Sequence, residues 1–524
     1  MSASKNKIFR NTTIVSVFTL ISRVFGYIRD AAIFIFISNA TGALDAFFVA
    51  FRIPNFFRRI FGEGALSIAY IPVLTDYKEN KKEEVKEFVD SSMTTIACIL
   101  LVVSIIGVLL APILIYIIAP GFINVGNSQV DLAVQLLQIT FPYMFFICLV
   151  AVAGGILNTY DNFSIPAITP VLMNLILIFS AIYLAPKFEE PVLALAIGVL
   201  VSGFVQLAFQ IYPLMKIGLL PKWNLNLYHS GIKKIKRLML PVIVGSSVTQ
   251  INLIFDTIIA SFLITGSIGW LYISDRFLEL PLAIFGVSIA TVMLPKLSMY
   301  YSQKNEDYFN KIINWGLKLT IVISIPTMTG LIMLSEPILI SLLQYREFSL
   351  YDVNMTSVSL IAFAAGLPAM IGAKILIPAF YSRQNTTFPV RAAIISVIFN
   401  FVLNIAFVIA LLSIEFKGVH MGLAMATSIS AYINFYLLFN EARKKGILSI
   451  DKSLLPLLFK TTIATIVMIF AINYFSLNAL EWSQWVIQKR LGILFSIIIS
   501  SIVIYLITLV ILRVRFNEFD HKHL

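Results

Sequence analysis

Charged residues are scarce in this sequence. Asp, Glu, Lys and Arg make up 13% of its 524 residues, whereas hydrophobic residues make up 59%. Soluble globular domains carry roughly a quarter of their residues charged. The scarcity therefore excludes an ordinary soluble domain and predicts a polytopic membrane protein.

Cysteine is rarer still, and catalytic motifs are missing. Cys98 and Cys148 lie in apolar runs without metal-ligand spacing, so we interpret them as small buried hydrophobes rather than a disulfide or a zinc site. The sequence has no nucleotide-binding loop and no nucleophile elbow. We expect neither an enzyme nor an ATPase, and no cofactor apart from the sodium ion discussed below.

Acidic residues are outnumbered, which gives a formal net charge of +12. The basic residues recur in the N-terminus and in loops 76–90, 216–237 and 441–453, while the alternate connections 39–44, 119–130 and 265–268 lack Lys and Arg. This is the positive-inside pattern, so it predicts cytoplasmic termini and argues against nucleic-acid binding. Lys489 and Arg490 contradict the pattern, because they fall on the predicted outer side.

Apolar runs long enough to cross a bilayer recur along the whole chain. At roughly twenty residues per span, the sequence predicts an all-α protein with about 14 transmembrane helices. We place them near 13–38, 45–75, 89–118, 131–157, 164–185, 191–214, 238–264, 269–300, 309–333, 354–380, 388–412, 419–440, 454–476 and 490–512.

Part of the sequence is repeated. Arg52 matches Arg276, the Ile-Phe-Gly at 60–62 matches that at 284–286, and Pro72 matches Pro295 after a one-residue gap. Six spans separate the copies, so the repeat is parallel and predicts two six-helix lobes. We divide the chain into an N-lobe (1–215), a basic cytoplasmic linker (216–237), a C-lobe (238–440) and an addition of two helices with a cytoplasmic tail (441–524).

The first predicted span contains charges that a bilayer disfavours. Arg23 and Asp30 are seven residues apart and share a helical face, as do Ser22 and Arg29. A charge at bilayer depth persists when it faces a partner or a wet cavity. We interpret the two arginines as lining a cavity, with Asp30 tethering one of them; the alternative is that they extend to the cytoplasmic interface.

The second predicted span is the most charged. Asp45, Arg52 and Arg59 repeat every seven residues, and Arg59 and Glu63 form an i,i+4 pair that is either functional or a structural salt bridge. Pro54 removes a backbone hydrogen bond and should kink the helix. We interpret this span as a mobile gating helix.

The eighth span carries Asp275, Arg276 and Glu279 before a proline. By the repeat, Arg276 should face Arg52. An arginine from each lobe suits a diphosphate, because planar guanidinium groups donate to phosphate oxygens in pairs.

Oxygen-bearing side chains on the seventh and eleventh spans suggest a cation site. Asp256 has Asn252 one turn before it, and Asn400 and Asn404 are an i,i+4 pair. A sodium ion prefers oxygen ligands. Interhelical hydrogen bonding, which Asn makes routinely in membranes, is the alternative.

Two stretches carry a resemblance to a known family. Residues 22–30 (Ser-Arg-Val-Phe-Gly-Tyr-Ile-Arg-Asp) and 45–65, which contains Arg-Ile-Pro-Asn-Phe-Phe-Arg-Arg, closely resemble the MurJ (MviN) family of lipid II flippases. Ser274-Asp275-Arg276 and Phe380-Tyr381-Ser382-Arg383-Gln384 support it. The resemblance covers essentially the whole chain and places it in the multidrug/oligosaccharidyl-lipid/polysaccharide exporter superfamily.

The resemblance implies alternating-access export of the undecaprenyl-diphosphate-linked peptidoglycan precursor across the bacterial cytoplasmic (inner) membrane. It assigns the cavity arginines to Arg23, Arg29, Arg58 and Arg276, with Asp45 as the functional acid. With the residues above, the expected substrate-binding set is Ser22, Arg23, Arg29, Asp45, Arg52, Arg58, Arg59 and Arg276. The expected gating or structural set is Asp30, Pro54, Asn55, Glu63, Asp275 and Glu279.

The resemblance also implies partners and a driving force. Some members have a sodium site with an acid on the seventh span and oxygens on the eleventh, which here are Asp256, Asn400 and Asn404 (an amide where an acid can occur). The last two helices resemble a groove for the lipid tail. The expected partners are lipid II, membrane lipids and cell-wall synthesis proteins, and the chain is expected to be a monomer driven by membrane potential or a cation.

Three other functions stay open. A drug/cation antiporter of the same fold would need an acidic cavity for its cationic substrates, and the arginines argue against it. A flippase for another lipid-linked oligosaccharide, of the O-antigen type, would share the arginines. A non-transporting scaffold for cell-wall synthesis would tolerate loss of Arg29 or Arg276.

Overall fold

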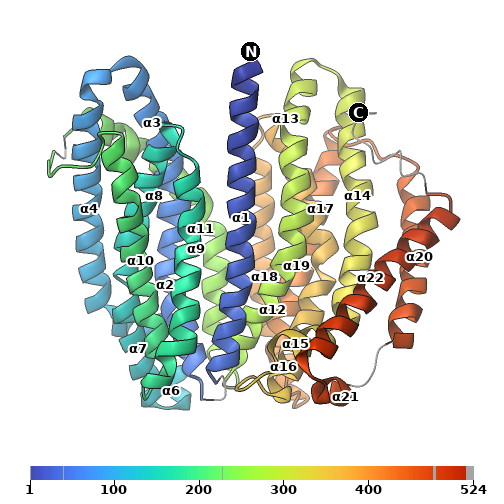
Figure 1. Ribbon diagram of the computed structural model, residues 1–524. Coiled ribbons are helices and arrows are strands. Elements are labelled where there is room, and N and C mark those ends of the chain that lie inside the picture. The colour runs from blue at the N-terminus through green and yellow to red at the C-terminus, as the bar shows by residue number, and fades with distance from the viewer. Residues whose placement is uncertain (1, 39–40, 227, 476–478, 515–524) are drawn as a thin grey trace. The chain divides into compact units, whose positions relative to one another are not determined.

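The computed structural model describes residues 2–38, 41–226, 228–475 and 479–514, with side-chain detail throughout these ranges except at 2–14, 62–65, 67, 241, 244–249 and 475. Within this part of the chain the secondary structure is entirely helical, as predicted (Figure 1). The chain forms two compact units, residues 1–268 with 346–348 and residues 269–345 with 349–524.

The first unit holds the helices up to the turn before α12. They are α1 (Ser2–Phe36), α2 (Ala43–Phe57), η1 (Arg58–Leu66), α3 (Ser67–Asn80), η2 (Lys82–Glu84), α4 (Val85–Leu109), α5 (Ala111–Ile118), α6 (Phe122–Val125), α7 (Asn127–Thr140), α8 (Tyr143–Thr159), α9 (Ser164–Phe179), η3 (Ser180–Leu184), η4 (Ala185–Lys187), α10 (Pro191–Lys216) and α11 (Ser230–Ala260). Within it, α1 packs on α9, α2 on α7, and α10 on both α8 and α9. The α11 helix, which we assigned to the C-lobe, packs here against η1 and α3; the predicted lobes are defined by symmetry rather than by packing and stay a prediction.

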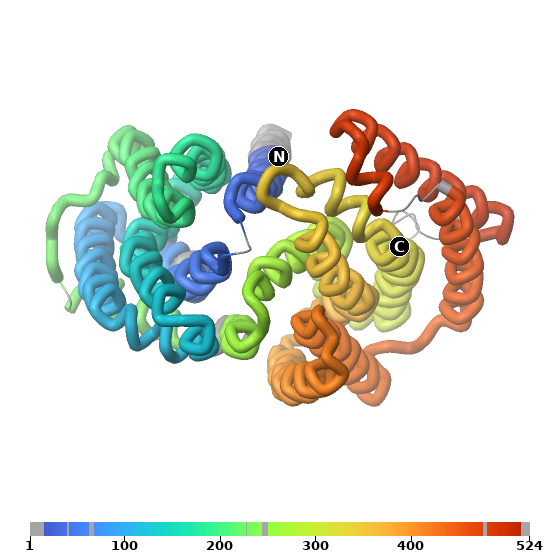
Figure 2. Tube along the Cα trace, turned by 90° about the horizontal axis from the view of Figure 1, so that it is seen from below, coloured from blue at the N-terminus to red at the C-terminus, as the bar shows by residue number. Residues whose placement is uncertain are grey.

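The second unit holds the remaining helices. They are α12 (Ser267–Pro281), η5 (Leu282–Val287), α13 (Ser288–Ser302), α14 (Glu306–Met333), α15 (Ser335–Leu343), α16 (Leu350–Ala365), α17 (Leu367–Tyr381), α18 (Thr387–Ser413), α19 (Met421–Lys444), α20 (Leu454–Phe475), α21 (Ala479–Gln484) and α22 (Ile487–Ile511). Figure 2 shows α20 and α22 side by side at the edge of this unit, where α20 packs on α14 and α22 on α15.

Every predicted span coincides with helical segments. Among the described residues, ten helices are long and apolar enough to cross a membrane, or eleven if the bent pair α16–α17 counts as one. The predicted spans that this test leaves out are α1, α2–η1–α3 and α11. The first two contain the charged residues from which the functional argument started.

The repeat is reproduced in an irregular piece of backbone. Each copy changes from α- to π-helical geometry, at η1 in the first unit and at η5 in the second. The alignment that pairs Arg52 with Arg276 places the first residues of the two π-helices, Arg58 and Leu282, at equivalent positions. The kink expected at Pro54 stays a prediction. In the first copy the π-helix starts at Arg58, and α2 continues through Pro54 without a break.

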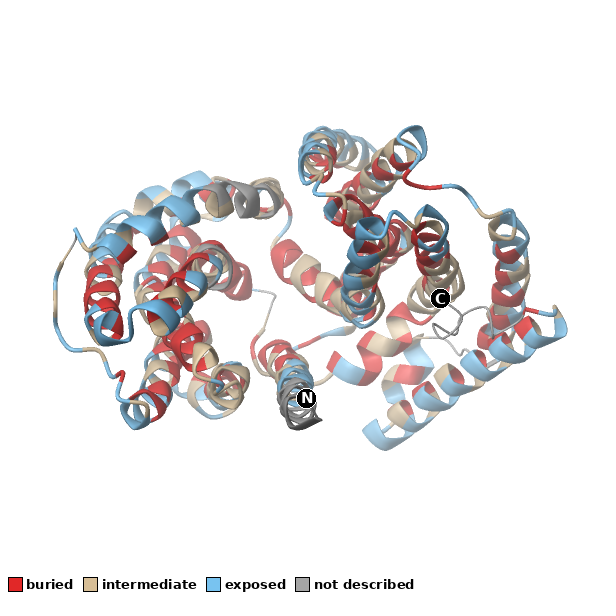
Figure 3. Cartoon of the chain, turned by 90° about the horizontal axis from the view of Figure 1, so that it is seen from above, coloured by how far each residue is buried: buried red, intermediate tan, exposed pale blue. Residues whose placement is uncertain are grey.

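Burial follows the pattern of a membrane protein. Large apolar side chains are exposed along the outer faces of the helices, for example Leu109, Phe204 and Ile409, whereas Ser, Thr, Asn and Gln side chains are buried between helices (Figure 3). Small residues let helices approach closely: a Cβ at Gly107 would lie 2.0 Å from the ring of Phe141.

Arg490, which contradicted the charge pattern, is buried inside the second unit. Its guanidinium donates to the carbonyl oxygens of Trp485 (2.8 Å), Ser483 (2.6 Å), Ile340 (3.1 Å) and Gln344 (3.1 Å). Two of these carbonyls belong to the C-terminal end of α15, where the helix dipole favours a cation. The residue holds α22 against α15 and α21, so its charge is not a loop charge of the kind that orients membrane helices.

Candidate functional site

The charged residues of α1 form a tethered cluster with α9. Arg29 donates from Nε and Nη2 to the Asp30 carboxylate (2.9 and 2.6 Å) and from Nη1 to Oδ1 of Asn174 (3.0 Å). Asp30 is buried, and the Asn174 amide donates in turn to the carbonyl of Ser22 at 3.0 Å. The predicted tether of an arginine by Asp30 is confirmed for Arg29.

Asn174 is a component that the sequence analysis missed. It lies on α9 in an otherwise apolar run, and a lone amide in such a run was the available signal. Ser22 takes part through its backbone carbonyl, and Arg23 on the neighbouring position is exposed.

On α2, Arg52 is bonded to α11. Its Nη1 donates to the carbonyl of Leu253 at 3.0 Å and to the hydroxyl of Thr257, which is buried. Because Thr257 itself donates to the same carbonyl at 2.6 Å, the three groups form one local network. The network aligns the guanidinium and joins the two helices inside the first unit.

Asp45 occupies the start of α2. Its carboxylate is buried and accepts the backbone N–H of Gly266 at 2.6 Å. An acid in the first turn of a helix is also favoured by the helix dipole. In this structure the expected functional acid therefore fixes the turn that precedes α12.

Two arginines start the π-helix η1. Arg58 donates from Nε to Oδ1 of Asn55 at 2.8 Å, and both Arg58 and Arg59 are half-buried. The Glu63 side chain lies outside the described residues, so the expected pair between Arg59 and Glu63 stays a prediction.

In the second unit, the predicted residues of α12 lie together. Arg276 forms an ion pair with Glu279 at 2.6 Å, and its guanidinium carbon lies 5.8 Å from the centre of the Tyr272 ring. Both charged side chains are partly exposed. Asp275 is half-buried beside them in the chain.

The residues of the expected sodium site lie in different units. Asp256 on α11 accepts from the Asn252 amide at 3.4 Å in the first unit. In the second, Asn404 donates to Asn400 at 3.0 Å, and Asn400 donates to Thr427 on α19 at 3.3 Å. Within the described ranges no three His, Cys, Asp or Glu residues gather in a metal-binding group. A site with one acid and several amides is not covered by that search, so the sodium site stays a prediction.

Four of the predicted arginines are held by hydrogen bonds to oxygen acceptors within their own unit. Arg29, Arg52, Arg58 and Arg276 each donate to a fixed oxygen on the same helix or on a neighbouring one. A side chain held in this way loses less conformational entropy when it binds a phosphate.

Comparisons with known proteins show the family of this chain. Residues 37–508 match the family model described as lipid II flippase MurJ. The chain is 40% identical to the "Probable lipid II flippase MurJ" of Vibrio cholerae over 98% of this chain and 97% of that protein. The chain belongs to the MurJ family. MurJ-family membership makes it a multi-pass membrane protein of a transporter family and not an enzyme.

Solved structures support the same assignment. A structure titled "Lipid II flippase MurJ, inward closed conformation" superposes with a TM-score of 0.78 at 30% identity, covering 96% of this chain and 99% of that one. An inward-facing multidrug transporter of the MATE family superposes with a TM-score of 0.66 at 15% identity, covering 83% of this chain and 98% of that one. The second likeness shows that the two chains share a fold.

Proposed function

We propose that this protein moves lipid II from the inner to the outer leaflet of the bacterial cytoplasmic membrane. The observation that carries the proposal is the set of arginines within the predicted membrane spans, together with relatives named lipid II flippases. An isolated guanidinium at bilayer depth costs several kcal/mol. A protein that keeps five or more arginines in its predicted spans needs an anion or an acidic side chain to compensate their charge.

The diphosphate of the lipid is the anion that we propose they bind. Arginine donates to phosphate in pairs of parallel hydrogen bonds and stays charged at any physiological pH. We assign this role to Arg23, Arg29, Arg58, Arg59 and Arg276, with Arg52 acting through its bonds to α11. Neutralising the diphosphate lowers the free energy of carrying it past the low-dielectric core.

The lobes alternate access and the empty carrier is reset by the membrane potential or by a cation. Moving one elementary charge through 100 mV changes the free energy by about 2.3 kcal/mol, which biases a two-state carrier about fiftyfold. Asp256, Asn400 and Asn404 are the residues that we propose for a sodium ion. Both termini are cytoplasmic in this proposal.

The test is depletion of the native flippase with complementation by variants, followed by measurement of precursor accessible at the outer leaflet. Arg29→Ala should abolish export, Arg29→Lys should restore part of it, and Asp256→Asn should slow it. The control is Arg443→Ala, because Arg443 is exposed at the end of α19 and far in sequence from the proposed set.

Two outcomes would contradict the proposal. Normal export by correctly inserted Arg29→Ala and Arg276→Ala proteins would favour a scaffold. Normal outer-leaflet precursor without any functional copy, in cells that have no second flippase, would exclude the flippase.

A further inference from the structure

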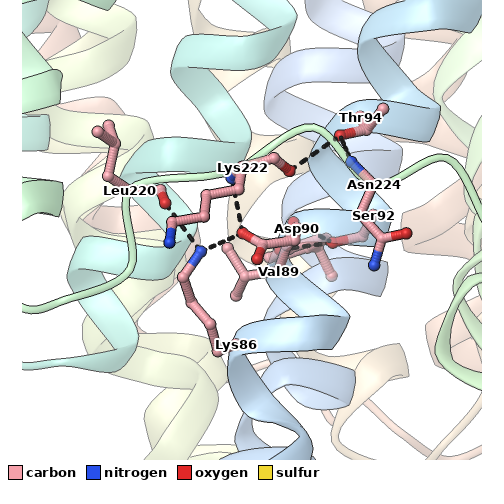
Figure 4. A network of polar contacts seen from close by, with 9 residues as sticks. Lys86, Val89, Asp90, Ser92, Thr94, Leu220, Lys222 and Asn224 are labelled. Carbon is pink, nitrogen blue, oxygen red and sulfur yellow. Dashed lines mark hydrogen bonds and ion pairs between the residues drawn. The ribbon is translucent and has the colours of Figure 1, made fainter.

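Between α10 and α11, residues 219–226 form neither helix nor strand and run along α4. The Asp90 carboxylate on α4 accepts the backbone N–H of Lys222 at 2.8 Å and pairs with the Lys86 ammonium, which also donates to the carbonyl of Leu220 at 2.9 Å (Figure 4). One turn further along α4, Thr94 accepts the N–H of Asn224 at 3.1 Å. We call residues 217–229 the first linker.

The two ends of the first linker are also anchored. Leu219 is buried near the start, and the His229 ring at the end lies 5.8 Å from the rings of both Tyr77 and Phe88. Gly231 follows at a point where a Cβ would lie 2.5 Å from the Phe88 ring. A segment held at its centre and at both ends has a defined outward face.

That outward face is apolar and aromatic. Trp223 is 78% exposed, Tyr228 is 83% exposed, and Leu225 is exposed as well. Trp223 and Leu225 are two residues apart, the spacing that places side chains on one side of an extended chain. Tyr212 and Met215, exposed on the last turns of α10, extend the same composition into the helix.

The exposed side chains of α4, on which the first linker packs, indicate where lipid lies relative to the linker. Leu101 and Ile105 are seven and eleven residues beyond Thr94, so they lie on the same face of α4. Both are exposed, and α4 is one of the helices suited to span a membrane. Leu101 is only about 10 Å along the axis from Thr94. Acyl chains beside Leu101 therefore place lipid headgroups at the level of the first linker.

The charge of the region complements an anionic headgroup layer. Between Glu190 and Asp256 the sequence contains no acidic residue. The basic residues in this stretch are Lys216, Lys222, Lys233, Lys234, Lys236 and Arg237. Of these, Lys234 pairs with Asp76 at 3.1 Å.

We propose that the first linker is a lipid-binding strap that lays Trp223, Leu225 and Tyr228 into the headgroup layer beside α4, with Lys222 and the basic residues that flank the linker bound to anionic phospholipid. Trp and Tyr are favoured at this depth, because their rings are apolar and their N–H and O–H groups can still reach water. The proposal is independent of what the protein transports.

Fluorescence quenching in nanodiscs tests the proposal. Wild-type protein and Trp223→Phe are compared in discs whose phosphatidylglycerol or phosphatidylcholine is brominated on the acyl chain near the headgroup. The other four tryptophans are common to both proteins, so the difference reports Trp223. We expect bromolipid to quench the Trp223 emission, and to quench it more as phosphatidylglycerol than as phosphatidylcholine.

The control places a tryptophan elsewhere on an exposed loop. Gln303→Trp in the Trp223→Phe protein puts the probe in the turn between α13 and α14, where the exposed neighbours Met299 (44%), Tyr301 (41%) and Tyr308 (38%) are less exposed than Trp223 and Tyr228. If bromolipid quenches Trp223 no more than this control, the insertion is overturned.

The preference for anionic phospholipid is tested separately. Lys222 is bonded to α4 through its backbone, so Lys222→Gln leaves those bonds in place. We expect it to reduce the preference for phosphatidylglycerol by up to about fivefold, which corresponds to the ~1 kcal/mol that one basic residue contributes at an anionic surface. Equal quenching by the two lipids in wild type would overturn the anionic preference.

Discussion

The two linkers that follow α10 and α19 are held by the same device. In the first linker the Lys222 N–H bonds to Asp90 of α4. In the second linker, residues 445–453, the Asp451 N–H bonds to Oδ1 of Asn314 on α14 at 3.0 Å. Asp90 and Asn314 are separated in sequence by the same spacing as Arg52 and Arg276. The repeat therefore includes the docking of a linker as well as the charged spans.

The linkers differ in where they put their apolar residues. Ile447 and Leu448 of the second linker are buried in a hydrophobic core with α14, α17 and α19. Trp223 and Leu225 of the first are exposed. Equivalent polar bonds thus hold one linker against a protein interior and the other against an outer face. The polar bonds determine where the linker backbone runs, and the apolar side chains between them determine whether the linker is buried or exposed.

The largest expected effect is the difference in stability between truncating a buried leucine of the second linker and an exposed leucine of the first. Leu448→Ala should lower the free energy of unfolding in detergent by about 2–5 kcal/mol, because it leaves a cavity in a packed core. Leu225→Ala should change it by less than about 0.5 kcal/mol, because the side chain is exposed. Denaturant or thermal unfolding of the purified proteins measures both, and equal losses would refute the distinction.

The shared device is tested by removing each acceptor. Asn314→Ala loses the bonds to the Asp451 N–H and the Ser449 carbonyl, and Asp90→Ala loses the bond to Lys222 and the pair with Lys86. Each should cost about 1–3 kcal/mol, since a partly buried backbone N–H loses its acceptor. Hydrogen exchange should accelerate at 449–451 in the first variant and at 222–224 in the second. Acceleration at both linkers in either variant would mean global loosening instead.

A smaller effect is expected one turn further along α4. Thr94→Val preserves shape but removes the acceptor for the Asn224 N–H. The expected loss is about 0.5–1.5 kcal/mol. Exchange at Asn224 should rise while exchange at Lys222, held by Asp90, stays near the wild-type rate; an equal rise at both positions would show that the bonds do not act separately.

The smallest effect is a pH dependence confined to the second linker. The Lys318 ammonium, 2.8 Å from Asp451, and the Ser453 N–H hold the pKa of that carboxyl at about 2, below its ordinary value of 3.8. A depressed folded-state pKa stabilises the fold above the ordinary value, and this stabilisation is lost as the pH falls from about 4 to about 2. Limited proteolysis of 445–453 should increase over that range in wild type. In Asp451→Asn it should be independent of pH there.

The sequence predicted the elements and the first charged pair, and it missed most of the partners. Apolar runs located the helices because a bilayer demands long apolar segments. The sequence predicted that Asp30 tethers one of the two arginines on this helix, and the structure shows that the tethered one is Arg29. The bonds of Arg52 to Leu253 and of Asp45 to Gly266 go to backbone groups. Every residue has such groups, so no pattern of side chains reveals them.

The local backbone geometry was also not predicted from the sequence. The π-helices, the bend at Gly366 between α16 and α17, and the burial of Arg490 depend on neighbours distant in the chain. The proposed sodium site combines Asp256 of the first unit with Asn400 and Asn404 of the second. Variants of these three residues test whether they act together.

The π-helix between α2 and α3 sets the rotation of everything that follows it. Deleting one residue from a helix turns the downstream part by about 100°, and a π-turn commonly accommodates one residue more than an α-turn would. Tyr70 and Tyr77 on α3 are fully buried and stack on Phe88, so this aromatic contact tolerates only one phase of the helix. A π-turn that loses its extra residue reverts to an α-turn, so deleting one residue within Arg58–Leu66 should keep both tyrosines in the core. Deleting one residue between Tyr70 and Tyr77 should turn Tyr77 away from Phe88, so the π-helix is the part of this span that tolerates a change in length.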